Sequence, residues 1–522
     1  MRKLLMASAA ILGASGGLAL AQPVANPNQG QLAAPYGAGP AANNNNNAWG
    51  TANTPSGSAA AGPLSTIYAP NVDAVPAPGT IVIRLNGRVE IDVTANFTSL
   101  DKGVTATGAP SGYKLNPVGI SSYVRLYPGF DGLAANGLRY GAAVEIRTNF
   151  SGASANGSTF ANGTAGAGTT SGTANGPSAN TSNQTLFVRR AFSYLASDNA
   201  GIVRLGQTDG VIGLFDNCIF TSQCWDAGTG NFNGGEPLQG IGPSGDSPPF
   251  VWLAQAGAEY GNSKAVYLSP QFFGFDFGVQ YAPNEGNSFA NEGNGVGCTQ
   301  AGPSCINVSS GNDATRWINQ VGVGLRYQNT FGPVDFKLYG FYETSGREQL
   351  TTSPYETPAQ ARGAAPLPAG APSASSQFQR YDNLSFYKAG VAVTALNFTA
   401  AADYIGGRVN GQLALAPTGG VNTNAIVTGL TYANGPITAG AIFGVIESQG
   451  DARLVGVSQR HEYEIAFGGA YRLAPGVQLV GEYMYEQRHQ GGFDFATGTI
   501  GTAGRTNDAR GQGVLFSTVL TW

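Results

Sequence analysis

Histidine is the residue type that most often carries acid–base or metal chemistry near neutral pH, and it is scarce in this chain. The chain has two histidines, His461 at an expected loop-to-strand junction and His489 in an expected loop. Neither has a serine-containing motif beside it, as a Ser-His-Asp arrangement would need. The two also lie apart in sequence, without the spacing of a metal pair. The residues therefore disfavour an enzyme, a metal site or a bound cofactor.

Cysteine is the second reactive type, and it occurs as two short-range pairs in glycine-rich, loop-like sequence. The pairs are Cys218 with Cys224, and Cys298 with Cys305. Their spacings do not fit zinc, and the histidines are far away in sequence. In an oxidising compartment such close pairs favour local disulfides. An incidental pair of free thiols is the alternative.

Charged side chains follow a strict alternation in one long stretch, residues 80–99. Its odd positions from 81 to 97 are all nonpolar, whereas its even positions from 84 to 98 are all polar or charged, Arg84 and Arg88 among them. A period of two puts the two sets on opposite faces of a β-strand. A tilted strand needs roughly 9–11 residues to cross a membrane. We interpret the stretch as a strand between lipid and water.

Similar alternation recurs to the end of the chain, separated by short turns with Gly, Asn or Pro and by long loops rich in Gly, Ser and Asn. We count 16 strands, the last over 513–522. The expected fold is all-β: a transmembrane antiparallel β-barrel with short periplasmic turns and long external loops. Closing the sheet satisfies every backbone group in lipid, and about 16 strands leave an aqueous lumen.

Two points in this strand pattern are ambiguous, the register of one strand and the start of another. In the strand around 186–196, Arg189 and Arg190 are adjacent, so one of them faces outward unless a bulge intervenes. The strand near 264–270 could begin as early as Ala254. Residues 131–137 are interpreted as a short turn.

The composition and the N-terminus point to the same class of protein. Charged residues make up 11% of the chain, against roughly 25% in soluble proteins. A net charge of -4 without any basic run disfavours nucleic acid as a partner. Residues 1–21 have a basic start and an A-x-A site, which predict a signal peptide. Residues 22–78 are predicted to be a disordered, low-complexity periplasmic extension, and residues 79–522 the barrel.

Taken in their order along the chain, the leader, the alternating strands with short turns and long loops, and the aromatic last residue resemble the general-diffusion porins of Gram-negative outer membranes. The resemblance spans 79–522 and includes the stretches RRAFSYL (189–195) and GIVRLGQTDG (201–210). Phe516 and Trp522 stand in the final strand where such porins carry the signal for the barrel-assembly machinery, with Trp522 in place of the usual Phe. The resemblance implies an outer-membrane homotrimer in contact with lipid, through which ions and small hydrophilic solutes diffuse passively.

The resemblance also implies a constriction, because in such porins the loop after the fifth strand folds into the lumen. Here that loop spans about 208–249, has no Lys or Arg, and carries acids that include Asp209, Asp216, Asp226 and Glu236. The first strands supply four arginines in the inward phase: Arg84, Arg88, Arg125 and Arg147. Acid facing base predicts a transverse field that orients polar solutes, and a Cys218–Cys224 bond would stiffen the loop. The alternative is that the acids lie in solvated turns and that the arginines only line a wall in contact with water, without forming a constriction.

Two further functions stay open. A channel selective for a sugar or a similar small solute would use inward aromatic residues, for which Tyr123, Tyr127, Tyr339 and Phe341 are candidates. The scarcity of lysine disfavours anion selectivity. A purely structural outer-membrane barrel would conduct nothing.

Overall fold

The computed structural model describes sixteen separate stretches of the chain. These are residues 78–99, 102–104, 110–114, 116–149, 187–197, 200–208, 210–212, 263–270, 272–284, 317–347, 381–410, 415–450, 456–474, 476–495, 499–500 and 507–522. The predicted leader (1–21) and all but the last residue of the predicted extension (22–78) lie outside them. Within the described stretches, no helix has the length and apolarity needed to cross a membrane.

Long β-strands make up nearly all of the described chain, as the two-residue alternation predicts. They are β1 (Thr80–Thr98), β4 (Val118–Leu133), β5 (Arg139–Asn149), β6 (Phe187–Ser197), β7 (Gly201–Gln207), β8 (Ser263–Leu268), β9 (Phe275–Asn284), β10 (Trp317–Phe331), β11 (Val334–Arg347), β12 (Ser385–Ala395), β13 (Phe398–Arg408), β14 (Thr423–Asn434), β15 (Ile437–Ser448), β16 (Arg460–Ala474), β17 (Val477–Gln490) and β20 (Asp508–Thr521). Two small sheets pair β2 (Lys102–Val104) with β3 (Pro110–Lys114) and β18 (Phe493–Asp494) with β19 (Thr499–Ile500).

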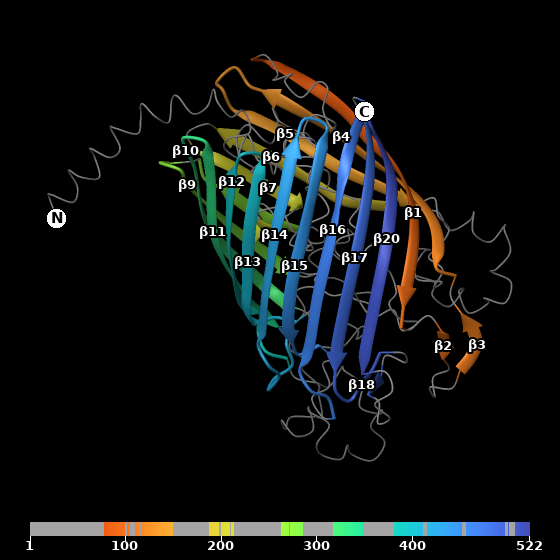
Figure 1. Cartoon of the computed structure of the whole chain (residues 1–522). Helices are drawn as coiled ribbons and strands as arrows, with labels where there is room; N and C mark the ends of the chain where they lie inside the picture. Colours follow the sequence, from red (N-terminus) through yellow and green to blue (C-terminus); the bar gives the residue numbers. More distant parts are fainter. Residues whose placement is uncertain are drawn as a thin grey trace.

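The long strands form one antiparallel barrel in which chain neighbours are also sheet neighbours (Figure 1). The sheet closes at β1, where Val93 stands opposite Phe516 of β20 on one side and opposite Ile120 of β4 on the other. Closure removes the unpaired strand edges that lipid cannot hydrogen-bond. The expected all-β antiparallel barrel is confirmed.

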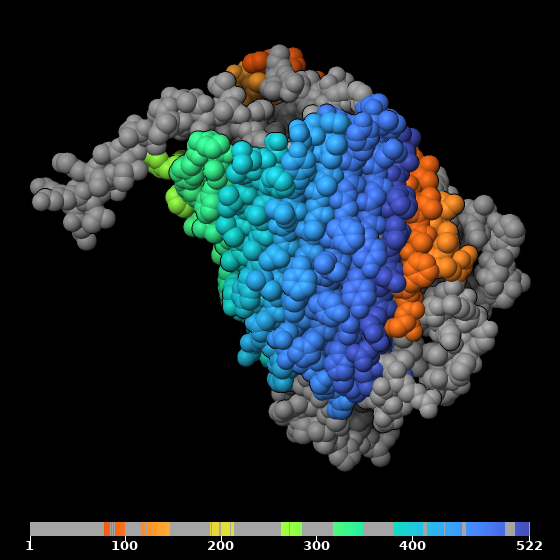
Figure 2. Space-filling view, in the orientation of Figure 1, coloured from red at the N-terminus to blue at the C-terminus, as the bar shows by residue number. Residues whose placement is uncertain are grey.

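The two faces of the wall carry the residue types that the sequence predicts. In β1 the side chain of Ile83 is 82% exposed on the outside, whereas Glu90 and Asp92 on the other face are 0% exposed. The same alternation runs through β10 and β12, whose burial changes at nearly every residue. In Figure 2 the outer face over β11 to β20 is a continuous, gently curved surface. The apolar residues on it therefore form the surface that meets lipid.

Aromatic rings lie near both ends of this outer face. Near the short turns, Phe398 lies 4.8 Å from Tyr432 between ring centroids. Toward the long loops, Tyr387 lies 5.7 Å from Tyr404, and Tyr463 lies 5.9 Å from Tyr485. Two such bands are typical of barrel surfaces at the membrane–water interfaces.

Three details of the strands differ from the expectation or resolve it. The register of β5 and β6 shifts so that Glu145 pairs with Arg190 and Ile146 with Val188, which makes Arg189 the extra residue of a bulge. Asp131 lies within β4 rather than in a turn, since β4 continues to Leu133. The prediction that His489 lies in a loop is wrong, because β17 runs on to Gln490.

Candidate pore lining

The inner wall is built from the alternate residues of each strand, and many of them are charged and buried. The buried acids are Glu90, Asp92, Asp131, Glu145, Asp276, Glu343, Asp403, Glu462, Glu464, Glu482 and Glu486. The buried bases are Arg204, Lys264, Arg326, Lys337, Lys388, Arg460 and Arg488. Because alternation sends the apolar residues outward, this dense set of charges faces the inside of the barrel.

The predicted basic residues fall on three adjoining strands. Arg88 of β1 pairs with Arg125 of β4, and Arg125 pairs with Arg147 of β5, so three arginine positions form one row across the wall. Arg84 pairs with Gly129 further toward the short turns. The backbone of all four is described, whereas their side chains are not. The register thus places three of the predicted positions together.

The same part of the wall also carries acids that the sequence analysis did not name as lining residues. Glu90 and Asp92 follow Arg88 at two-residue steps on the inner face of β1. The hydroxyl of Ser517 donates a hydrogen bond to Asp92 across the β1–β20 seam. The wall at β1 is therefore of mixed charge rather than purely basic.

The chain that follows β7 enters the barrel interior. Val211 and Ile212 are 0% and 1% exposed, and the backbone N–H of Val211 donates to the side-chain oxygen of Gln280 on β9. A Cβ added at Gly278 of β9 would lie 2.9 Å from the methyl groups of Val211, so this glycine leaves room for the valine. The first turn of the predicted loop is thereby attached to the inner wall. The acids Asp209, Asp216, Asp226 and Glu236 lie outside the described residues, as do Cys218, Cys224, Cys298 and Cys305.

Gln280 belongs to a hydrogen-bonded group that supports this attachment. Its amide nitrogen donates to Glu343 of β11 at 3.3 Å, and the amide of Gln320 on β10 donates to the other oxygen of Glu343. Three neighbouring strands thus hold the acceptor that receives the Val211 N–H. A shared network of this kind restrains each side chain more than a single pair does.

Two buried ion pairs lie on the inner wall between β9 and β13. The guanidinium of Arg326 donates to both oxygens of Asp276. On β13, Asp403 accepts a hydrogen bond from the Tyr339 hydroxyl at 2.7 Å and lies 3.3 Å from the Lys388 ammonium. Within each of these two pairs the opposite charges lie close together, so the pair itself leaves little net field.

Acids gather on β16 and β17, a feature that the sequence analysis missed. Glu464 stands directly opposite Glu486 in the strand register, while Glu462 lies 3.4 Å from Arg488. Glu482 lies on the same face of β17. The sequence carries the signal, because the two-residue alternation that sends the apolar Tyr463, Ile465 and Phe467 outward also sends the glutamates between and before them inward.

Inward aromatic residues are also present where expected. Tyr127, Tyr339 and Phe341 are 1%, 2% and 3% exposed on the inner face, and Phe341 lies 6.1 Å from Phe386 between ring centroids. The side chain of Tyr123 is outside the described residues.

The two residues expected to form the assembly signal lie at the seam. Phe516 faces outward and is 63% exposed. Trp522 exchanges backbone hydrogen bonds with Gly87 of β1 at 3.1 and 3.2 Å. The end of the chain is therefore paired with the first strand.

Comparison with known proteins gives one family. A family model described as Gram-negative porin matches residues 56–490. No curated protein sequence matches the chain.

The solved structures that match the chain are distant from it in sequence. The anion-selective porin from Comamonas acidovorans is 12% identical, with a TM-score of 0.44 over 85% of this chain and 100% of that one. In vitro folded OmpT of Vibrio cholerae, in its trimer form, is 11% identical with a TM-score of 0.41, over 85% and 100%. A mutant of the Rh. blastica porin is 14% identical with a TM-score of 0.39, over 84% and 100%.

Proposed function

The chain belongs to the Gram-negative porin family, and we propose that its channel narrows at a neck where an acidic loop faces a basic wall. Membership of the family makes it an outer-membrane protein that forms a channel for passive diffusion. Membership also supports a channel rather than an enzyme. What we propose beyond the family's function is the neck, the residues that form it and the solutes that it favours.

The observation that carries the proposed neck is the position of Val211. The residue is buried inside the barrel and is bonded to Gln280 of the wall, so the segment from 208 to 249 starts in the lumen rather than outside it. The acids Asp216 and Asp226 follow Val211 by five and fifteen residues. A loop that starts inside can carry them toward the arginine row on β1, β4 and β5.

The proposed neck is tested by reversal potentials of single channels in a salt gradient. A unit charge about 10 Å from a passing ion changes its energy by about 0.4 kcal/mol in water, or about twofold in local concentration. We expect Asp216→Asn/Asp226→Asn to shift permeability toward anions by about twofold or more, and Arg88→Gln/Arg125→Gln to shift it toward cations. Glu356→Gln, in the long loop between β11 and β12, is the control. Equal potentials in all four channels would contradict the neck.

A solute-selective channel is the second candidate, because aromatic residues lie on the inner side of the wall. Phe341 of β11 lies 6.1 Å from Phe386 of β12 between ring centroids, with Tyr339 on the same face of β11. These three rings are nearly fully buried, so a sugar ring can stack on them only when the groups that cover them move. Conductance recorded with and without added sugars distinguishes the two functions. Concentration-dependent current block at millimolar sugar would favour selectivity, and an unchanged current would favour general diffusion.

Assembly and export complete the proposal. Family membership supports a homotrimer, which predicts a heat-sensitive trimer band in mild detergent, whereas a monomer there would contradict it. We propose that residues 1–21 direct secretion, that residues 22–78 form an extension before the barrel, and that the barrel-assembly machinery reads β20. Local disulfides at Cys218–Cys224 and Cys298–Cys305 remain predictions, checked by mass spectrometry without reduction.

A further inference from the structure

The two histidines of the chain, although separated by 27 other residues, stand directly opposite one another in neighbouring strands. His461 of β16 pairs with His489 of β17. Their side chains are 51% and 48% exposed, and both belong to the outward phase of their strands. Side chains directly opposite in an antiparallel pair have Cβ atoms about 4.5–5.5 Å apart. The pair is therefore close enough to act together.

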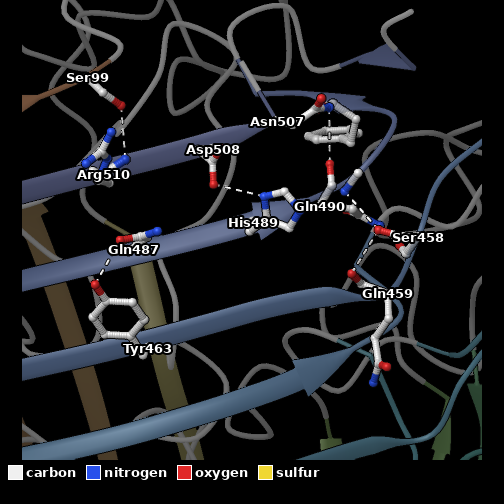
Figure 3. Close-up of polar contacts among 12 residues, drawn as sticks. Ser99, Ser458, Gln459, Tyr463, Gln487, His489, Gln490, Asn507, Asp508 and Arg510 are labelled. Atoms are coloured by element: carbon white, nitrogen blue, oxygen red, sulfur yellow. Dashed lines mark hydrogen bonds and ion pairs between the residues drawn. The ribbon is translucent and has the colours of Figure 1, made fainter. Parts of the chain in front are cut away.

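A carboxylate flanks each histidine on the side away from the other. The Nδ1 atom of His461 lies 3.3 Å from a carboxylate oxygen of Glu447, the residue opposite it on the neighbouring strand β15. The Nδ1 atom of His489 lies 2.9 Å from Asp508 on β20 (Figure 3). Four residues on four successive strands thus form one row: Glu447, His461, His489 and Asp508. We call this row the rim row.

The carboxylates determine which ring nitrogen remains available. An ionised carboxylate only accepts hydrogen bonds, so the Nδ1 atom that faces it donates, and in the neutral ring Nε2 then keeps its lone pair. Metal-binding histidines commonly have this arrangement, in which a carboxylate holds the far nitrogen and orients the ring. His489 has this arrangement with Asp508, and the Nδ1 atom of His461 is turned toward Glu447 at 3.3 Å.

The rim row lies beyond the band of tyrosines on the outer face. Tyr463 follows His461 by two residues in β16, and its hydroxyl donates to Gln487 at 2.8 Å (Figure 3). Two residues along a strand span about 6–7 Å. The β17 end that carries His489 leads to β18, which Figure 1 shows at the end of the barrel opposite the C-terminus. The row is therefore at the loop end, where water and ions reach it.

We propose that His461 and His489 form a two-nitrogen site for a divalent transition-metal ion such as Zn²⁺ on the outer rim of the barrel. Imidazole nitrogen is a preferred ligand of Zn²⁺ and Cu²⁺. Within the described residues, no group of three or more His, Cys, Asp or Glu is placed to hold a metal. Water completes the coordination, so the bound ion is exchangeable, and it joins β16 to β17.

Affinity for Zn²⁺ provides the first test. Purified full-length protein in detergent is titrated with ZnCl₂ in competition with a chelating dye, and we expect one ion per chain. His461→Gln and His489→Gln should each weaken binding at least tenfold. Glu447→Gln and Asp508→Asn should each weaken it about tenfold, the lower end of what loss of an orienting carboxylate costs. Circular dichroism and heat modifiability show whether each variant folds.

A matched variant keeps two histidines but separates them. His489→Gln/Ala135→His moves one histidine to the exposed turn between β4 and β5, at the short-turn end. This variant should bind as weakly as His489→Gln alone. Binding equal to wild type, either here or in His461→Gln/His489→Gln, would overturn the proposal, because the ion would then be held elsewhere.

Electron paramagnetic resonance with Cu²⁺ gives a readout that folding alone does not change. Wild-type protein should show coupling to two imidazole nitrogens, and each single variant should show coupling to one. A one-nitrogen spectrum in the wild type would also overturn the proposal.

Discussion

Gly87 is the residue at which the end of the chain meets its first strand. A Cβ added there would lie 2.0 Å from the indole ring of Trp522, so the ring occupies the space that a side chain would take. The backbone bonds between the two residues lock this position. The larger Trp in place of the usual terminal Phe is therefore accommodated by a glycine on the facing strand.

We expect Gly87→Leu to destabilise the barrel by about 1–3 kcal/mol, since overpacking of this kind forces neighbouring groups to move. Urea unfolding of the protein refolded in lipid vesicles, followed by tryptophan fluorescence, measures the change. Gly340→Leu on β11 is the matched control, because a Cβ added at that outward glycine meets nothing within 4 Å. Equal unfolding midpoints for the two variants would contradict the packing role of Gly87.

Lys388 and Asp403 make a second prediction at the residue scale. Both side chains are almost fully buried, at 1% and 3% exposed, with 3.3 Å between charged atoms. Removing one member of a buried pair leaves the other uncompensated, which typically costs about 3–5 kcal/mol.

Lys388→Met should therefore lower the free energy of unfolding by about this amount. The double variant Lys388→Met/Asp403→Asn should recover most of the loss, because the unpaired charge is gone. Urea unfolding of wild type, both single variants and the double variant gives the coupling energy. A double variant as unstable as Lys388→Met would show that the pair is not what the lysine contributes.

At the scale of the strand, the alternation makes a depth-dependent prediction. Leu325 lies in the middle of β10, faces outward and is 54% exposed. Leu325→Arg should cost about 2–4 kcal/mol if this position meets hydrocarbon, whereas a charge near an interface costs about 0–1 kcal/mol. Gln512→Arg, on the outer face of β20 beside the Tyr483 hydroxyl, is the rim control. Unfolding in vesicles should separate the two variants, and equal costs would place Leu325 outside the membrane.

The sequence predicts where strands occur and which side chains face outward, because few other structures produce a two-residue period with one apolar face. Strand ends could not be predicted, since polar residues that face water continue the wall beyond the lipid. His489 illustrates this: β17 extends past the membrane band, so its apolar pattern stops before the strand does. The Arg189 bulge was an open alternative, because adjacent arginines fit neither register and only pairing with β5 decides which one is extra.

The candidate site was predictable in part for a related reason. Phase alone identified the inward arginine positions, and their alignment into one row depends on the register among β1, β4 and β5, which no local pattern encodes. The same alternation also predicts that the glutamates of β16 and β17 face inward. The attachment of Val211 to Gln280 joins residues 69 apart and has no local signal.

At the scale of the whole molecule, closure is the property on which a lumen depends. The seam between β1 and β20 joins residues separated by most of the chain, and Ala95 stands opposite Val514 there. Directly opposed residues of antiparallel strands have Cα atoms about 4.5–5.5 Å apart, which suits a disulfide. A cross-link at this pair therefore reports whether the two ends of the sheet meet.

We expect Ala95→Cys/Val514→Cys to form an intramolecular disulfide after mild oxidation of the folded protein in membranes. The linked chain encloses a loop of over four hundred residues, so it should migrate differently from the reduced chain on a denaturing gel. Ala95→Cys/Leu520→Cys places the second cysteine six residues along β20 and should not link, and the parent chain controls for its own four cysteines. Efficient linking in the opposed pair alone supports a closed wall with this register. Absence of linking in a folded, conducting protein would mean that another pair of strands closes the pore.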